Sequence, residues 1–246
     1  MTDIPQPSPF LLQPPDPALE LSLVIPCYNE AETLPRTIPP LVKELVEHGV
    51  KCELILVRNG SKDDTGKVIN GFIAAGMPVK RVDVEVNQGY GWGIINGMRQ
   101  ARGTFVGYMG CDGQIAPEDV YRTWRAINRA EERTFAKVRR MARNDGALRW
   151  FVSRAYNLLF LILFRAITTD VNGVPKFVHR DELEKIAPTA KDWFIDAEFV
   201  IKARRDQLTF VEVPVDFMVR AGGKTNVRFG TVFEFIKNML RAKWNW

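Results

Sequence analysis

Residues 21–28, LSLVIPCY, form a short apolar run that is followed at once by the polar residues NEAET at 29–33. A continuous apolar run bounded by polar residues predicts a buried strand. The same pattern recurs along the first half of the chain, with further strands expected at 53–57, 82–86 and 104–109. Helices are expected between them, at 30–48 (interrupted by Pro39-Pro40), at 63–75 and from 89 toward 103. Strands that alternate with helices indicate βαβ units, so the predicted fold class is α/β, with a Rossmann-like, mainly parallel sheet and flanking helices.

The rest of the chain is less regular. An apolar helix is expected at 151–167, strands at 174–179 and 209–217, and an amphipathic helix at 231–246. Residues 1–18 contain six prolines and few hydrophobic residues, which predicts an extended arm outside the core. We therefore expect a Pro-rich arm (1–18), one folded domain (19–228) and an amphipathic C-terminal helix (229–246).

Composition argues against several classes of protein. Hydrophobic residues make up 46% of the chain and charged residues 26%, which is ordinary for a globular protein. The three cysteines form no CxxC pair and the two histidines lie far apart, so we expect neither disulfides nor a zinc site. No signal peptide is visible, and the longest uncharged apolar run, 158–164, is far shorter than the roughly 20 residues that span a membrane. A reducing, cytoplasmic compartment is expected.

Positive charge is concentrated between Arg122 and Arg154, where ten lysines and arginines accompany three acids in a chain of net charge +5. Such a block can be a solvated surface, a nucleic-acid patch, or a surface for phosphates and anionic lipid. No aromatic-basic pattern typical of nucleic-acid binding accompanies it, so we expect no nucleic-acid partner.

Polar residues follow each of the first four predicted strands, at 29–30, 59–61, 87–91 and 112–114. Doubly wound sheets bind ligands at the carboxyl ends of their strands. The sequence therefore predicts a ligand site at this edge of the sheet.

The motifs at these strand ends resemble those of family 2 glycosyltransferases. VIPCYNE (24–30) resembles the family motif that lines the nucleotide pocket, where Glu30 can accept a hydrogen bond from a ribose hydroxyl. LVRNGSKDDT (56–65) stands where relatives have V-D-D-G-S-x-D-x-T, with Arg58 and Asn59 replacing the two acids; Ser61 could instead cap the next helix. NQGYGWG (87–93) resembles the Gly-rich segment that lets a helix N-terminus approach a diphosphate. The resemblance implies that a UDP- or GDP-sugar donor is bound by Pro26, Tyr28, Glu30, Asn59, Ser61, Asn87, Gly91 and Asp112.

The segment GYMGCDGQIAPED (107–119) resembles the metal-binding signature D-A-D-x-Q…P-E-D of this family. Asp112 matches the second acid and Gln114 the amide, whereas Gly110 stands where the first Asp belongs. Mg²⁺ and Mn²⁺ prefer oxygen ligands, and one carboxylate with diphosphate oxygens and water can hold such an ion. The resemblance therefore implies Mg²⁺ or Mn²⁺ at Asp112 and Gln114, and the alternative is an acidic turn that opens a helix at Pro117.

Residues 140–157, RMARNDGALRWFVSRAYN, resemble the polyprenol-phosphate branch, the dolichol-phosphate mannose synthase-like enzymes. The matching positions are expected to bind the phosphate of a polyprenyl phosphate acceptor, since arginine forks suit phosphate oxygens; they are Arg140, Arg143, Arg149 and Ser153. DVNGVPK (170–176) resembles the same branch, and WFIDAEF (193–199) carries a D-x-E pattern. The closing region 213–225 gives Arg220 and Lys224 as groups that contact the diphosphate or the acceptor phosphate.

The resemblance implies a catalytic domain of the GT-A type that inverts the anomeric carbon in one in-line displacement. Asp112, the metal, Arg220 and Lys224 would stabilise charge on the leaving diphosphate. A lipid phosphate needs no strong base, but a sugar hydroxyl does, and Asp196 is the expected base for that alternative. A third alternative is a nucleotide-binding module without catalysis, because Arg58, Asn59 and Gly110 depart from the family pattern. The C-terminal helix, rimmed by basic residues, is expected to bind an anionic membrane surface peripherally.

Overall fold

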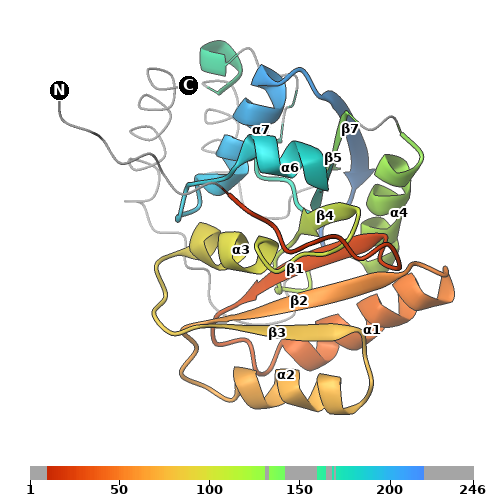
Figure 1. The fold of residues 1–246 in the computed structure, drawn as a ribbon, viewed down its shortest axis with the longest axis vertical. Coiled ribbons are helices and arrows are strands. Elements are labelled where there is room, and N and C mark those ends of the chain that lie inside the picture. The colour runs from red at the N-terminus through yellow and green to blue at the C-terminus, as the bar shows by residue number, and fades with distance from the viewer. Residues whose placement is uncertain (1–9, 131–132, 142–159, 165–167, 169, 219–246) are drawn as a thin grey trace.

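The computed structural model describes residues 10–130, 133–141, 160–164, 168 and 170–218 (Figure 1). Its strands are β1 (Leu21–Cys27), β2 (Cys52–Asn59), β3 (Val79–Val84), β4 (Phe105–Tyr108), β5 (Thr134–Arg140), β6 (Lys176–His179) and β7 (Thr209–Val215). Its helices are α1 (Leu34–Glu47), α2 (Thr65–Ala74), α3 (Tyr90–Met98), α4 (Pro117–Asn128), α6 (Arg180–Ile186) and α7 (Ile195–Arg205). Residues 160–164 are also helical.

The strands form one seven-stranded sheet in the order β3-β2-β1-β4-β6-β5-β7. Only β6 runs against its neighbours; it is antiparallel to both β4 and β5. The other pairs are parallel, as βαβ connections require. The predicted α/β fold with a mainly parallel sheet is thereby confirmed.

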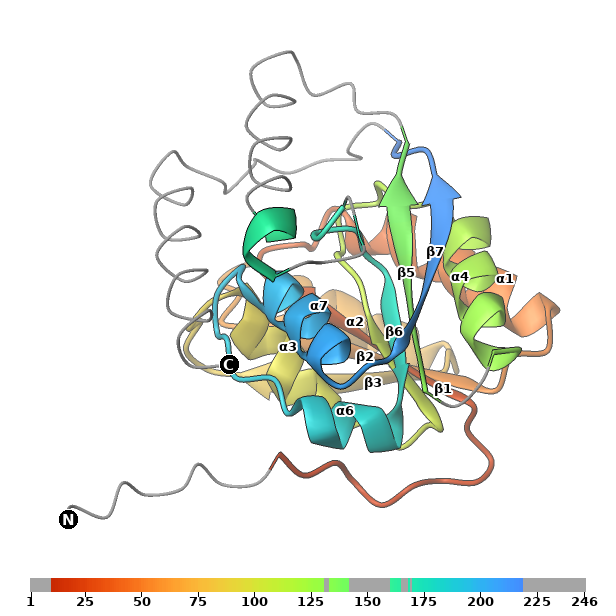
Figure 2. The same ribbon diagram turned by 90° about the horizontal axis from the view of Figure 1, so that it is seen from above.

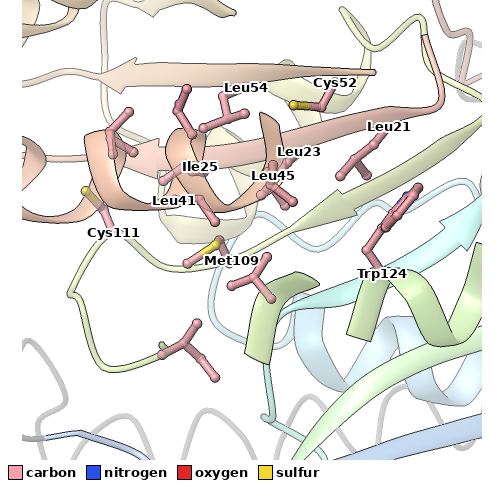
Figure 3. Packing of buried hydrophobic residues seen from close by; sticks show 14 of the residues in the cluster. Leu21, Leu23, Ile25, Leu41, Leu45, Cys52, Leu54, Met109, Cys111 and Trp124 are labelled. Atoms are coloured by element: carbon pink, nitrogen blue, oxygen red, sulfur yellow. The ribbon is translucent and has the colours of Figure 1, made fainter. Parts of the chain in front are cut away.

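Helices cover both faces of the sheet, so β1 is buried along its whole length. Alternate residues of β1 enter different cores, because successive side chains of a strand point to opposite faces. Leu23 and Ile25 pack with α1, α2 and α4, and Figure 3 shows them close to Leu41 and Leu45. Val24 packs in the other core, with α3, α6 and α7. Figure 2 shows α1 and α4 on one side of the sheet and α6 and α7 on the other.

The first helix differs from its prediction in two ways. It begins at Leu34 and not at residue 30, and Pro39 and Pro40 lie inside it without interrupting it. Each proline removes one hydrogen bond to a carbonyl four residues earlier. Those carbonyls belong to Pro35 and Arg36, which are exposed, so water can satisfy them.

Other element boundaries also required correction. The third strand spans 79–84 and not 82–86, and β5, α6 and α7 were not predicted at all. β5 escaped notice because its sequence, TFAKVRR, contains three basic residues. The prediction that residues 1–18 lie outside the core is wrong at Phe10. This residue is 8% exposed and packs in the core on the side of the sheet that α3 covers.

Cys27, Cys52 and Cys111 are all free and buried, as the absence of a disulfide pattern predicted. Within the described ranges, no helix is both long enough and apolar enough to cross a lipid bilayer. The predicted C-terminal helix at 229–246 lies outside those ranges.

Candidate functional site

Parallel pairing places the carboxyl ends of β1, β2 and β4 side by side, and hydrogen bonds join the loops that follow β1 and β2. The Ser61 hydroxyl donates to the Cys27 carbonyl at 3.1 Å and accepts from the Asn29 amide at 3.1 Å. Asn29 has a φ of 56°, and its side-chain oxygen accepts from the Lys62 amide at 2.8 Å. Ser61 therefore holds two loops together and does not cap α2, which begins at Thr65 with Asp63 accepting the Thr65 amide.

Asn59 lies at the end of β2 with its side chain almost fully buried at 3% exposure. The Asn59 side-chain nitrogen, Nδ2, donates to the Gly89 carbonyl at 3.0 Å and to Asn87 Oδ1 at 3.4 Å. Its Oδ1 is buried and has no hydrogen-bond partner within the described part of the chain. A buried oxygen without a partner is costly, so this oxygen is suited to accept from a bound ligand.

The glycines at the start of α3 allow close packing with two other segments. A Cβ on Gly93 would lie 3.0 Å from Asn59 Nδ2 and 3.1 Å from Pro26 Cβ. A Cβ on Gly91 would lie 2.2 Å from the Ala190 carbonyl oxygen. These contacts gather the predicted residues Pro26, Asn59, Asn87 and Gly91 around the N-terminus of α3. They also give Gly91 a packing reason that sequence alone did not reveal. Two further residues predicted to bind the donor lie nearby: Tyr28 is 41% exposed just past β1, and the Glu30 amide donates to Thr65 Oγ1 at 2.9 Å.

Asp112 lies in the loop after β4, at the same edge of the sheet. Its Oδ1 accepts from the Gln114 amide at 3.2 Å, and the Gln114 side-chain nitrogen donates to the Met218 carbonyl at 3.4 Å. A Cβ on Gly110 would lie 3.8 Å from Asp112 Oδ1, in ordinary van der Waals contact, so this position adjoins the carboxylate but supplies no oxygen ligand. No group of three or more His, Cys, Asp or Glu residues able to hold a metal occurs among the residues that the structure covers. Asp112 and Gln114 would hold Mg²⁺ or Mn²⁺ only together with oxygens from outside the chain, such as those of a diphosphate or water, because these ions take several oxygen ligands.

A buried ion pair lies beneath this edge of the sheet. Lys176 begins β6 opposite Tyr108 and is 1% exposed, and its Nζ donates to Asp196 Oδ1. The same oxygen accepts from the Tyr108 hydroxyl at 2.8 Å. Burial lowers the pKa of Lys176 to about 8, although the Asp196 carboxylate acts to raise it. Asp196, the base expected for a hydroxyl acceptor, is thus already bound to a buried cation.

A second buried ionic cluster joins β5 to the segment before β6. Lys137 is fully buried, and its Nζ donates to the Asp170 carbonyl at 2.6 Å and to Glu212 at 3.2 Å. Arg140 donates to the Asp170 carboxylate through Nε at 2.8 Å and Nη2 at 2.5 Å. Burial favours the neutral acid, but Arg140 and Lys137 hold the pKa of Asp170 well below its usual range.

This cluster revises the interpretation of the basic segment. Lys137 is in the interior, so the ten basic residues between Arg122 and Arg154 do not form one continuous surface. Two nitrogens of the Arg140 guanidinium donate to the Asp170 carboxylate. A phosphate bound at Arg140 would therefore have to accept hydrogen bonds from the remainder of that guanidinium. Five predicted residues lie outside the described ranges: Arg143, Arg149, Ser153, Arg220 and Lys224.

Sequence reasoning missed the roles of Tyr108, Lys137 and Lys176 as buried polar groups. The available signal was a single lysine between apolar neighbours, in FAKV at 135–138 and in VPKFV at 174–178. Lysines are almost never fully buried unless paired, so such a lysine points to an acidic partner elsewhere in the chain. Which acid is the partner depends on the tertiary fold.

The chain is similar to known proteins in both sequence and fold. Residues 22–207 match the model of the family described as glycosyl transferase family 2. A dolichyl-phosphate beta-glucosyltransferase from Dictyostelium discoideum is 24% identical, over 92% of this chain and 74% of its own length. A dolichol-phosphate mannosyltransferase from Pyrococcus furiosus is also 24% identical, over 92% of this chain and 64% of its own length.

Solved structures share the fold. Glucosyl-3-phosphoglycerate synthase from Mycobacterium tuberculosis, solved with Mn²⁺, UDP-glucose and phosphoglyceric acid, superimposes with a TM-score of 0.71 at 19% identity. The match covers 92% of this chain and 79% of the synthase chain. Another structure of that synthase contains Mg²⁺ and UDP, with a TM-score of 0.70. The architecture is that of the GT-A fold.

Proposed function

We propose that this chain, which belongs to glycosyl transferase family 2 and is a nucleotide-sugar-dependent glycosyltransferase, transfers its sugar to a polyprenyl phosphate. The single observation that carries this choice of acceptor is the state of Asp196, whose Oδ1 is occupied by Lys176 and Tyr108. If Asp196 took a proton from a sugar hydroxyl, Lys176 would become a buried cation without its counter-charge, which is costly. A phosphate acceptor is already anionic and needs no such base. Two curated relatives that act on dolichyl or dolichol phosphate, by their names, support the same class of acceptor.

The proposed reaction is a single displacement at the anomeric carbon. An oxygen of the acceptor phosphate forms a new bond to the anomeric carbon. The bond between that carbon and the nucleoside diphosphate breaks at the same time, so the configuration inverts. The electron pair leaves with the diphosphate, and no proton has to move. When bound, Mg²⁺ or Mn²⁺ would neutralise charge on the diphosphate. In our proposal Asp112 holds the ion, Gln114 orders the loop, and Arg220 and Lys224 add positive charge to the leaving group.

Donor binding is proposed at the carboxyl ends of β1 and β2. The partnerless Asn59 Oδ1 is suited to accept from an N–H group of the base, whether the donor is a UDP- or a GDP-sugar. Pro26, Tyr28, Glu30 and Asn87 would surround the nucleoside, and Gly91 would bring the start of α3 close to the diphosphate. Ser61 would act indirectly, by fixing the loop that carries Asn29 and Glu30.

Acceptor binding is proposed around Arg140, with Arg143, Arg149 and Ser153. Asp170 fixes the orientation of the Arg140 guanidinium, and Arg140 directly precedes the other three proposed residues in the sequence. The helix predicted from the sequence at 229–246, outside the described residues, would bring the enzyme to the anionic membrane surface in which a polyprenyl phosphate is embedded.

The test is transfer of radiolabelled sugar from UDP- and GDP-sugars into organic-extractable product with polyprenyl phosphate as the acceptor. Activity should require the lipid phosphate and should be lost with the unphosphorylated polyprenol. Arg149→Ala should weaken use of the lipid phosphate about tenfold or more while nucleotide-sugar affinity stays nearly unchanged, since a charge-assisted contact contributes roughly 1.5–3 kcal/mol. Transfer only to free sugar hydroxyls would contradict the proposal and would return Asp196 to consideration as a base.

A further inference from the structure

Two aromatic rings stack where α3 meets the loop before α7. Tyr90, the first residue of α3, and Trp193 have ring centroids 4.4 Å apart and ring planes inclined by 16°. Tyr90 is partly buried, whereas Trp193 is 36% exposed. An offset stack of this kind fixes the orientation of the inner ring. Trp193 therefore holds the Tyr90 ring in place from the side that faces solvent.

The loop that carries Trp193 is itself rigidly fastened. Glu198, fully buried at the start of α7, accepts from the amides of Thr189 at 2.9 Å and Ala190 at 2.7 Å. The Lys191 carbonyl accepts from the Trp92 amide at 2.9 Å, which ties the loop to α3. Side chains held by such supporting contacts can present a functional group with little reorganisation.

The Tyr90 phenol lies within electrostatic range of both acids of the candidate site. Burial raises its pKa well above its usual value, and the carboxylates of Asp196 and Asp112 raise it further. The phenol therefore stays neutral and keeps its proton, as a donor and acceptor of ordinary hydrogen bonds. Tyr90 also begins α3, and the first turn of this helix packs against Pro26 and Asn59 at the edge of the sheet where the donor site is proposed.

We propose that the Tyr90 hydroxyl hydrogen-bonds a hydroxyl group of the transferred sugar, and that Trp193 is the positioning residue that orients the Tyr90 ring. The inference rests on the proposed function, since it takes Asp112 as the group that holds the donor diphosphate. A sugar hydroxyl suits this place better than a phosphate does, because a neutral phenol offers no charge to a phosphate oxygen.

Calorimetry with the full chain tests this by comparing two ligands, the nucleotide sugar and the matching nucleoside diphosphate, in the presence of Mn²⁺. Tyr90→Phe removes only the hydroxyl, so it should weaken nucleotide-sugar binding about threefold to tenfold, the scale of one hydrogen bond, and leave diphosphate binding unchanged. Trp193→Ala should weaken nucleotide-sugar binding in the same selective way, and Trp193→Phe, which keeps a ring for stacking, should restore it. Tyr121→Phe is the matched control, because it also removes one phenol hydroxyl but lies on α4, where the Tyr121 ring stacks on His48; its binding should equal that of the parent.

Equal weakening of both ligands in Tyr90→Phe would overturn the inference, as would no weakening of either. So would a Trp193→Phe variant that binds no better than Trp193→Ala. These outcomes can be distinguished from a failure of the proposed function, which is measured on the unmodified chain. If the unmodified chain binds a nucleotide sugar and transfers its sugar to polyprenyl phosphate, the proposed function holds whatever the Tyr90 variants do.

Discussion

Two aspartates near the candidate site differ in what surrounds them. Asp112 lies in a loop, is only partly buried and accepts from the backbone of that loop. Asp196 is buried and paired with Lys176. A partly exposed acid can be reached by a metal and a diphosphate, whereas one already bound to a buried lysine suits a structural role. Residue type alone does not separate these roles.

Replacement of Asp112 by Asn should lower turnover by at least about a hundredfold, because the carboxylate is the principal proposed ligand of the metal. Steady-state transfer measured across a range of Mn²⁺ concentrations checks this, and excess chelator should abolish the activity of the parent. An Asp112→Asn enzyme with full activity, or a parent enzyme indifferent to chelator, would remove the metal from the mechanism.

Lys176 predicts a pH dependence of stability. Its pKa in the folded protein, about 8, lies below its ordinary value of 10.5. Between these values the unfolded chain binds more protons than the folded one, so the free energy of unfolding should rise with pH from about 8 to about 10. Urea denaturation across this range should show a smaller rise in Lys176→Met than in the parent. Lys43→Met, at an exposed position of α1, should keep the parental rise, and equal slopes in all three proteins would contradict the assignment.

Among the elements, α3 is the one whose sequence is most constrained by its neighbours. It packs on β1 and β2, and its N-terminus meets the loop that precedes α7. Its glycines are required by close approach, since each faces another segment of the chain. The Gly-rich sequence that resembles a diphosphate motif is thus also a packing motif.

Gly97→Ala and Gly71→Ala should change stability in opposite directions. A Cβ on Gly97 would lie 2.3 Å from Val24 Cγ1 and 2.7 Å from Val57 Cγ2, so α3 would have to move away from the sheet. Overpacking of this kind costs about 1–3 kcal/mol. A Cβ on Gly71, in the middle of α2, meets nothing within 4 Å, so alanine should stabilise by roughly 0.4–1 kcal/mol. Urea denaturation of both variants checks the pair, and a stable Gly97→Ala would mean that α3 packs less tightly than described.

At the scale of the whole molecule, the sheet separates two kinds of interior. On its α1 side lies the core that contains Leu23 and Trp124, where the buried polar residues of α1 and α4, Thr37 and Thr123, are uncharged. The part of the sheet formed by β5, β6 and β7 instead carries buried charges, in the pairs Lys137–Glu212 and Lys176–Asp196. Buried pairs of this kind add little net stability, but loss of one partner is costly. We therefore propose that these ion pairs hold β5, β6 and β7, the part of the sheet next to the proposed acceptor site, in one arrangement.

The proposed membrane contact belongs to this scale as well. Phe233→Glu with Phe235→Glu, in the C-terminal segment outside the described residues, should release the protein from anionic liposomes, because each change places a charge on the apolar face of the helix. Co-sedimentation measures the bound fraction. The matched control is Val46→Glu with Ile73→Glu, at exposed apolar positions of α1 and α2, which should still bind. Equal binding of both double variants would exclude the C-terminal segment as the contact.

The sequence alone determined the order of the first βα units and the edge at which polar residues gather. Both are local properties: the apolar run of β1 and the position of Asp112 after β4 are legible within a few residues. The sequence did not determine β5. A strand with several basic residues can be predicted only if its buried lysine is known to have an acidic partner. Nor did it show that the helix through Pro39 and Pro40 continues, which depends on exposed carbonyls.

Only the tertiary structure decided what the buried polar groups do. Lys176 meets Asp196 across 20 residues of sequence, and Ser61 bridges to Cys27 across 34. Tyr90 meets Trp193 only because the loop before α7 folds back onto the start of α3. Periodicity is a property of neighbouring residues and is therefore visible in a sequence. The pairing of charges and rings depends on which distant segments share an interior, and that is fixed only when the sheet assembles.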